Sequence, residues 1–462
     1  MIFKAIDKKT IFSIHKNDLI FFFLYTFLIF TIYNLVNYNL DEALGKEKGP
    51  PLVYDENIKI TLFAEDLNFP IGIDFLGKND MLVIEKNTGQ VKRILNNEIM
   101  IDPVLDLNVA SESERGLLGI AILNEKDLTT LNNEKIQGNN LNNEIKVFFF
   151  YTETKDTDNG DILGNRLYKY DFVDGKLINP KLLLDLPFLP GPSHNGGVLE
   201  LGPDNNLYLV VGDLNREANP EYMTLAQNIE NSQMPDGRGG VLRMTVEGNP
   251  VQEGNSFPLE NSDMSNFYYG YGIRNSFGIS FDPVTGILWE TENGSNYGDE
   301  INVILSGFNG GWRQVLGLSS EYENYKNKIF DKNKLTLLNK KGTYYEPVFT
   351  WVDTVAPTAI TFINSKNFGE EYENDLLVGS VKQGRIFHFN LNETRTGLDL
   401  SSEQQLVDKV ANIDKELDSI IFGRNFGVIT DIEINPYDGN IYIVNGQSKN
   451  GKIYQLSKNL EQ

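Results

Sequence analysis

A repeated hairpin pattern restricts the fold of this chain more than any other feature of its sequence. An alternating apolar segment is followed by a turn of Pro, Asp, Asn or Gly and then by a second apolar run. Alternation with a period of two around such a turn is typical of β-hairpins. The pattern is clearest in four stretches: IGIDFLGKNDMLVIEK (71–86), GGVLELGPDNNLYLVVGD (196–213), FGISFDPVTGILWETENG (277–294) and ITDIEINPYDGNIYIVNG (429–446). Two divergent copies lie at 117–172 and 358–391.

Six such units over roughly 400 residues give each unit about 65 residues, enough for four strands and long loops. A single unit leaves a face of its sheet uncovered, so the units need to stack against one another to bury a core. We therefore predict an all-β fold, a six-bladed β-propeller that occupies residues 55–462. A pair of β-sandwiches is the alternative architecture. An Asn-rich stretch at 125–143 is interpreted as a surface insertion in the second unit.

The first part of the chain has the pattern of a membrane anchor. Residues 1–18 are basic, residues 19–36 carry no charge, and the next charged residue is Asp41. At about 1.5 Å per residue, an apolar helix of this length nearly crosses the bilayer core. We predict a basic cytoplasmic tail (1–18), a transmembrane helix (19–38) and a linker (39–54).

The charges that flank this segment predict its orientation. Basic residues precede it and acidic residues follow it, so the positive-inside rule keeps the N-terminus in the cytoplasm and exports the body. We expect a single-pass protein of the cell membrane with an extracytoplasmic propeller. A signal peptide whose cleavage releases a secreted body is the alternative, although no convincing cleavage site follows the apolar run.

Composition excludes several kinds of chemistry. The chain contains no cysteine, which rules out disulfides, thiolate metal ligands and thiol nucleophiles. The formal net charge of −23 predicts a body that repels nucleic acid and stays soluble. We therefore expect no nucleic-acid partner.

Two segments carry residues suited to binding or catalysis. His194 lies in a Pro-Ser-His-Asn-Gly-Gly turn, where glycines let a ligand approach the backbone and an imidazole titrates near neutral pH. By contrast, His388 alternates within an apolar strand pattern and is interpreted as structural. Arg274 and Asn275, at the start of a predicted strand, are suited to hold a carboxylate or carbonyl oxygen. A simple ion pair is the alternative for Arg274.

The segment 290–312, ETENGSNYGDEINVILSGFNGGW, is dense in carboxylate, amide and carbonyl oxygens. Ca²⁺ prefers several oxygen ligands from flexible loops. A polar loop between two blades has the same composition, so both interpretations stay open.

Taken in order, segments of the body resemble the glucose/sorbosone dehydrogenase family, whose sugar dehydrogenases use pyrroloquinoline quinone (PQQ). The resemblance extends from about 58 to 457 and implies a six-bladed propeller with PQQ over one face. The segments that carry it include FPIGIDF (69–75), SERGLLGIAI (113–122), HNGG (194–197), GGVLRM (239–244), GIRNSFGISF (272–281), VAPTAITF (355–362), LLVGSVKQGRI (376–386) and ITDIEINPYDGNIY (429–442).

The resemblance also implies roles for individual residues. His194 matches the general base that takes a proton from the sugar hydroxyl, Asp213 matches the acid that orients this base, and Arg274 matches the residue that stabilises charge on the quinone. Contacts with the cofactor would come from Glu114, Asn275 and Lys382. The carbonyls of Gly294 and Ser295 match ligands of a Ca²⁺ beneath the quinone, and Glu300 with the carbonyl of Gly310 matches a second, structural Ca²⁺ site.

Several positions depart from the family pattern. The PQQ-binding enzymes place arginines just before the final Asp-containing strand, where this chain has Val428 and Thr430. A family Gln in the Arg-Asn segment is Phe277 here, and another is often found where this chain has Glu114.

Two functions remain. The first is a PQQ-dependent aldose dehydrogenase, which oxidises a sugar to a lactone by hydride transfer to PQQ with the assistance of Ca²⁺ and then passes electrons to an external acceptor. The alternative is a PQQ-free propeller at the cell surface that binds carbohydrate or protein.

Overall fold

The computed structural model describes residues 49–124, 144–156, 160–251, 253–254, 257–259 and 263–459. The chain divides into two compact units, Met1–Glu47 and Lys48–Gln462, and every described residue belongs to the second. The predicted tail (1–18), membrane segment (19–38), most of the linker and the insertion at 125–143 lie outside the described residues. Among those described, no helix combines the length and the apolar character needed to span a membrane.

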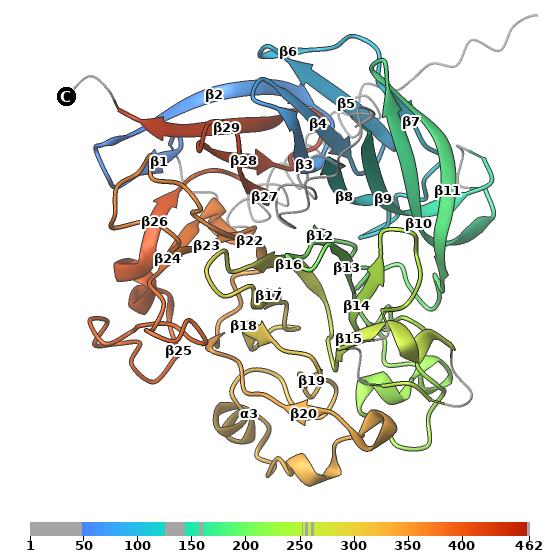
Figure 1. Ribbon diagram of the computed structural model, residues 1–462. Coiled ribbons are helices and arrows are strands. Elements are labelled where there is room, and N and C mark those ends of the chain that lie inside the picture. Colours follow the sequence, from blue (N-terminus) through green and yellow to red (C-terminus); the bar gives the residue numbers. More distant parts are fainter. Residues whose placement is uncertain are drawn as a thin grey trace, which may run out of the picture. The chain divides into compact units, whose positions relative to one another are not determined.

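The strands of the described unit form six sheets (Figure 1). The first three sheets follow one another along the chain. The first contains β3 (Pro70–Gly77), β4 (Asp80–Glu85), β5 (Gln90–Leu95), β6 (Glu98–Ile99) and β7 (Leu105–Asp106). The second contains β8 (Leu117–Asn124), β9 (Ile145–Thr154), β10 (Ile162–Val173) and β11 (Lys176–Leu186). The third contains β12 (Leu199–Leu201), β13 (Asn206–Val211), β14 (Gly240–Thr245), β15 (Tyr268–Tyr271), β19 (Phe308–Asn309) and β20 (Thr343–Tyr344).

Of the other three sheets, the fifth and the sixth combine strands from both ends of this unit. The fourth contains β16 (Ser276–Phe281), β17 (Leu288–Glu292), β18 (Asp299–Ile304), β21 (Phe349–Trp351) and β25 (Val410–Ala411). The fifth contains β22 (Pro357–Phe362), β23 (Leu376–Ser380), β24 (Ile386–Phe389), β26 (Ile421–Arg424) and β1 (Leu52–Val53). The sixth contains β27 (Ile429–Ile434), β28 (Ile441–Asn445), β29 (Gly451–Lys458) and β2 (Ile58–Leu67).

Helices are few and short in the described part of the chain. The α-helix there is α3 (Ser319–Lys326), and the remaining helical turns are of the 3-10 type. These turns are η1 (Pro220–Tyr222), η2 (Leu225–Gln227), η3 (Asp263–Phe267), η4 (Lys332–Lys334), η5 (Leu338–Lys340), η6 (Lys382–Gly384) and η7 (Asp414–Ile420).

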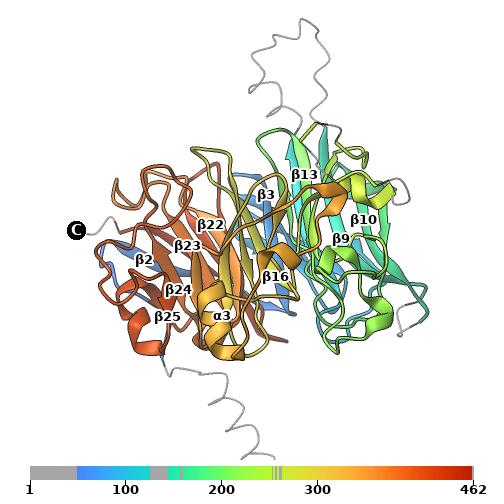
Figure 2. The ribbon, with the colours of Figure 1, turned by 90° about the horizontal axis from the view of Figure 1, so that it is seen from below.

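The sheets are arranged in a closed ring. The strands β3, β8, β12, β16, β22 and β27 each contact the next in this order, and β27 returns to β3. Figure 2 shows strands of successive sheets standing side by side when the unit is viewed from below. The prediction of an all-β propeller is therefore confirmed, because sheets that meet around a ring through their innermost strands define this architecture.

Pairing between the two ends of the unit holds the ring closed. The strand β2, near its start, pairs antiparallel with β29, near its end, from Ile58 opposite Lys458 to Leu67 opposite Gly451. One sheet therefore contains strands from both ends of the chain segment, so opening the ring requires breaking an entire ladder of backbone hydrogen bonds.

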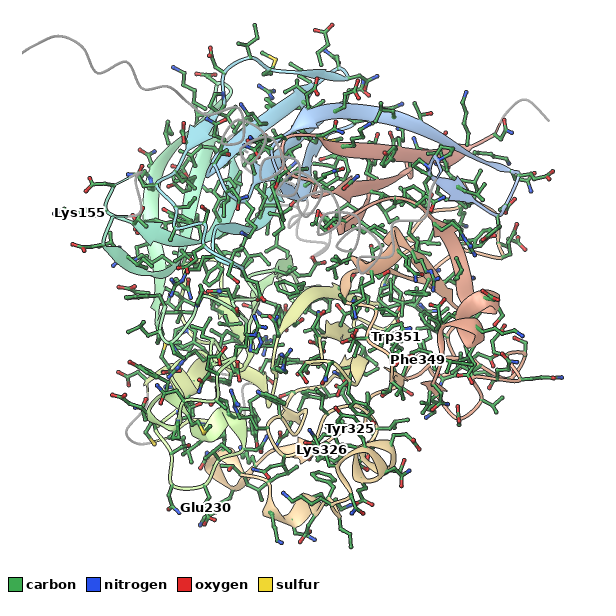
Figure 3. All side chains as sticks on the ribbon, turned by 180° about the vertical axis from the view of Figure 1, so that it is seen from behind. Lys155, Glu230, Tyr325, Lys326, Phe349 and Trp351 are labelled. Carbon is green, nitrogen blue, oxygen red and sulfur yellow. The ribbon has the colours of Figure 1, made fainter. Side chains whose placement is uncertain are left out.

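The hydrophobic core lies between neighbouring sheets. A cluster between the fourth and fifth sheets contains Trp289, Phe349, Trp351 and Phe387, all fully buried. Figure 3 labels Phe349 and Trp351 on β21 among these side chains. A strand with a sheet on either side buries both of its faces, which explains the uninterrupted apolar run 147–151 in β9.

Candidate active site

A buried His–Asp pair is formed at the ends of the third sheet. His194 lies in the turn before β12, and Asp213 follows β13, the next strand of the same hairpin. His194 has a φ of 63°, in the left-handed region that few side chains favour. Gly197, with a φ of 111°, follows it, and a Cβ there would lie 2.6 Å from the Cβ of Leu118. The strained backbone of His194 and the missing side chain of Gly197 therefore fix the direction of this turn.

The imidazole and the carboxylate face each other directly. Nδ1 of His194 lies 2.6 Å from Oδ1 of Asp213, and both side chains are buried. Oδ2 of Asp213 accepts hydrogen bonds from Nε1 of Trp312 at 2.8 Å and from Nη2 of Arg313 at 2.6 Å. Oδ1 also accepts from the backbone N–H of Asn215 at 2.9 Å.

This surrounding keeps Asp213 ionised. Burial opposes its ionisation, but the hydrogen bond from His194, the charges of His194 and Arg313 and the Asn215 N–H together lower the pKa of Asp213 to about 2. Because the carboxylate of Asp213 accepts a hydrogen bond from Nδ1, a neutral imidazole of His194 carries its proton on Nδ1. Nε2 of His194 is then an acceptor, as a general base requires.

Arg274 is fixed beside this pair. Its Nη1 donates to the carbonyl oxygens of Asn293 at 2.5 Å and Gly294 at 3.1 Å, and its backbone N–H donates to Oε1 of Glu292 at 2.6 Å. The guanidinium lies 5.5 Å from the ring centroid of Trp312, which also bonds to Asp213. Burial lowers the pKa of Arg274, and nearby carboxylates oppose that shift. Trp312 therefore contacts both predicted catalytic groups.

Glu114 and Asn275 join the site from two other sheets. Oε2 of Glu114 accepts a hydrogen bond from the backbone N–H of His194 at 2.5 Å and from Nδ2 of Asn275 at 3.2 Å. Oδ1 of Asn275 is buried and has no hydrogen-bond partner among the described residues. A buried amide oxygen without a partner marks a position where a ligand can donate a hydrogen bond.

The ammonium of Lys382 bonds to Thr354, and its predicted contact with a cofactor stays a prediction. Its Nζ donates to the carbonyl oxygen and to Oγ1 of Thr354, at 2.6 and 2.5 Å. It lines a separate cavity of about 280 Å³ together with Trp351, Arg385 and Asp414. No hydrogen bond or ion pair found for the described residues connects Lys382 with Glu114 or Asn275.

The predicted calcium ligands belong to two sites, Gly294 with Ser295 and Glu300 with Gly310, and both sites stay predictions. Ser295 is exposed, and the carbonyl of Gly294 faces the Arg274 guanidinium, a cation that competes with a metal ion. Glu300 is buried and accepts a hydrogen bond from the side-chain amide of Asn302. The backbone N–H of Gly310 donates to the carbonyl oxygen of Tyr271. Burial raises the pKa of Glu300 to about 7. In the part of the chain that the structure describes, no group of three or more His, Asp or Glu side chains is placed to hold a metal.

A second cavity, of about 260 Å³, is lined by residues that neighbour the His–Asp pair. Glu114 and Gly196 belong to both regions, since Glu114 bonds to His194 and Gly196 follows it by two residues. The side chains that line it are mostly apolar, including Phe69, Ile71, Leu118, Val198, Phe277, Val381 and Val428. We name it the Phe277 cavity.

Several residues of this site were not singled out from the sequence. Trp312 was noticed only as the end of an NGGW segment, and nothing local indicated that it reaches Asp213. Arg313 and Lys86 carried no motif, and Glu292 belonged only to the oxygen-rich segment 290–312 as a whole. These residues are identified only by their contacts in the folded structure, because each contacts a residue that is distant in the sequence.

Comparisons with known proteins agree with this architecture. A sequence profile described as "Glucose / Sorbosone dehydrogenase" matches residues 67–455. The quinoprotein glucose dehydrogenase B of Acinetobacter calcoaceticus is 27% identical over 398 residues, which cover 73% of this chain and 78% of that protein. The aldose sugar dehydrogenase YliI of Escherichia coli is 27% identical over 272 residues, which cover 59% of this chain and 62% of that protein.

Two solved structures share the fold. The apo form of the soluble aldose sugar dehydrogenase from Escherichia coli has a TM-score of 0.61 at 20% identity, covering 87% of this chain and 100% of that one. The PQQ-bound aldose sugar dehydrogenase from Streptomyces coelicolor has a TM-score of 0.57 at 19% identity, covering 88% and 99%. The class of protein is thus a sugar-dehydrogenase-like propeller. The chain belongs to the glucose/sorbosone dehydrogenase family.

The residues of the Phe277 cavity do not fit PQQ, which carries three carboxylates. Val428 and Thr430, at the positions of the family arginines, both line this cavity. Thr430 directs its hydroxyl to the carbonyl oxygen of Pro70 at 3.0 Å. Lys86 and Glu114 are its two charged side chains, and their formal charges cancel. A trianion there would be desolvated without matching cations, which is strongly unfavourable.

Proposed function

We propose that this protein oxidises a hydroxyl group of a small sugar, with His194 as the base. The observation that carries the proposal is the buried His194–Asp213 pair, at 2.6 Å, which Glu114 connects to a cavity. It is supported by membership of a family named for sugar dehydrogenases. An aldose oxidised at its anomeric carbon gives a lactone, and this is the substrate class that we assign.

The chain's own residues account for the proton transfer. Nε2 of His194 takes the hydroxyl proton, and the ionised Asp213 stabilises the resulting imidazolium. As the proton leaves, the carbon–hydrogen bond breaks with its electron pair, which a bound acceptor receives. Arg274 contributes a fixed positive charge beside the pair, where charge develops during the transfer.

PQQ and Ca²⁺, which the resemblance implies, do not enter this mechanism. The relatives include a quinoprotein and a PQQ-bound enzyme, so a quinone is the kind of acceptor that the family supports. The absence of matching cations in the Phe277 cavity argues against the tricarboxylate itself.

Two further features belong to this proposal. The first is a propeller of six blades, one for each sheet, and the closed order of the innermost strands supports this number. Residues 19–38 anchor the protein in the cell membrane, with the propeller outside. A protease added to intact cells should digest the propeller and leave the N-terminal tail, and protection of the propeller would reverse this orientation.

The test is oxidation of a panel of aldoses by the full-length chain with an artificial electron-accepting dye, with and without added PQQ and Ca²⁺. We expect turnover with at least one aldose. If turnover appears only with PQQ and Ca²⁺, the chain uses the family's cofactor and the sugar oxidation stands. If no aldose is oxidised under any condition, the proposed function is wrong.

A second candidate is a propeller that binds carbohydrate or protein without catalysis. The observation that favours it is the Phe277 cavity, whose wall at Val428 and Thr430 lacks the family arginines. The two functions differ in the same assay, because a binding module would retain a sugar on titration yet never reduce the dye.

A further inference from the structure

The Phe277 cavity has a lining that is unusual for a site beside charged catalytic groups. Its walls come from innermost strands of several sheets and are largely aliphatic or aromatic. A pocket with apolar walls and a few polar groups is typical of a small-molecule site. Burial of apolar ligand surface here would supply most of the binding free energy.

Apart from Lys86, the polar side chains of this cavity considered next already have partners inside the protein. The hydroxyl of Thr358 donates to the carbonyl oxygen of Ile429 at 2.7 Å, and that of Thr430 donates to Pro70. Oε2 of Glu114 accepts from His194 and from Asn275. An anionic ligand would therefore have to displace existing bonds or lie beside a carboxylate, and both are costly.

Lys86 provides one donor for a ligand. Its Nζ donates to the carbonyl oxygen of Ser113 at 2.8 Å and to Oδ1 of Asn87 at 3.0 Å, but its contact with the carbonyl oxygen of Ser111 is long, at 3.5 Å. A hydrogen bond of this length is weak. The N–H of Lys86 that makes this long contact can therefore donate to a ligand carbonyl with little loss of hydrogen-bond energy. The ammonium also lies 5.4 Å from the ring centroid of Phe69, so an aromatic wall adjoins the donor.

We propose that the Phe277 cavity binds an uncharged quinone, which replaces PQQ as the oxidant of the sugar. The apolar walls suit the ring system, Lys86 suits one carbonyl oxygen, and Glu114 connects the cavity to His194. The role of the quinone as oxidant rests on the proposed function, whereas the binding of the quinone does not.

The electron balance closes with this acceptor. The sugar loses a hydride from carbon and a proton from its hydroxyl, which gives the carbonyl product. The electron pair reduces the quinone, and the proton passes through Nε2 of His194 to a quinone oxygen. The quinone leaves as the hydroquinone, so two electrons and two protons are transferred in total.

Calorimetric titration of the full-length chain with menadione, an uncharged two-ring quinone, tests the proposal, with PQQ as the charged comparison. We expect menadione to bind the wild type at least about tenfold more tightly than PQQ, since PQQ would carry unpaired charges into the cavity. Val428→Arg should reverse this order. Val407→Arg places the same charge on an exposed valine and should change neither affinity.

Phe277→Trp provides a second test that adds no charge. The larger ring reduces the cavity and should weaken menadione binding while leaving the folded state intact, as checked by the melting temperature. Tighter binding of PQQ than of menadione to the wild type would overturn the inference, as would menadione affinity unchanged in both Val428→Arg and Phe277→Trp.

A turnover measurement separates this inference from the proposed function. Aldose-dependent reduction of menadione supports both. Dye reduction that needs PQQ and Ca²⁺, with no menadione binding, overturns the quinone assignment and leaves sugar oxidation in place. Menadione binding that depends on Val428, with no aldose oxidised by any acceptor, overturns the proposed function and leaves the ligand site.

Discussion

The indole Nε1 of Trp312 donates a 2.8 Å hydrogen bond to Oδ2 of Asp213, although the two residues lie 99 positions apart. Trp312→Phe removes this donor and keeps the aromatic ring beside Arg274. With one donor fewer, the carboxylate of Asp213 is oriented less firmly toward His194. We expect turnover to fall by about tenfold with little change in KM. Tyr325→Phe, on α3, is the control and should change neither quantity.

The replacement Asp213→Asn should have a larger effect. The amide cannot stabilise an imidazolium, and it no longer fixes the proton of the neutral ring on Nδ1. We expect kcat to fall by about 10³–10⁴-fold. A steady-state assay at several pH values measures this, and a decrease of less than tenfold would show that the pair does not serve the reaction.

The hairpins of the propeller were predictable because their signals are local. The segment 429–446 carries its own alternation and turn, and it forms β27 and β28. The same holds for 71–86, which forms β3 and β4. Short-range alternation identifies a strand without any knowledge of its neighbours.

The site was predictable only in part. The resemblance brought His194 and Asp213 together, and they are hydrogen-bonded. Lys382 was assigned to the same cofactor; its ammonium bonds to Thr354, a contact that no local sequence signal indicated. Such contacts depend on how loops of different sheets meet, and neither periodicity nor turn residues encode that.

Carboxyl groups in the middle of the ring should make stability depend on pH. Burial, together with the nearby Asp74 and Asp431, raises the pKa of Glu200 to about 8, above its ordinary value of 4.5. The folded state therefore keeps a proton that the unfolded state releases, so this group reduces stability as pH rises from about 4.5 to 8.

Glu200→Gln removes that penalty. We expect the melting temperature of the variant to equal that of the wild type near pH 4.5 and to exceed it near pH 8. Glu98→Gln, at an exposed position, is the matched control. An equal effect of Glu200→Gln at both pH values would contradict the raised pKa.

The core between the fourth and fifth sheets should be sensitive to truncation. Trp351 is fully buried among Phe349, Phe387 and Trp289. Trp351→Ala should lower the unfolding free energy by about 3–5 kcal/mol, because it removes apolar contacts and leaves a cavity. Ile329→Ala, at a residue 83% exposed, should change it by less than about 0.5 kcal/mol. Denaturant unfolding followed by tryptophan fluorescence would measure both.

The most direct test of this account is the turnover of His194→Ala with the best aldose, compared with the wild type and repeated with added imidazole. His194 is the proposed base, so we expect kcat to fall by about 10²–10⁴-fold, with partial recovery when imidazole supplies the missing acceptor. Sugar affinity, measured separately by titration, should change little. Turnover of His194→Ala equal to that of the wild type would contradict the central claim that this histidine accepts the sugar's proton.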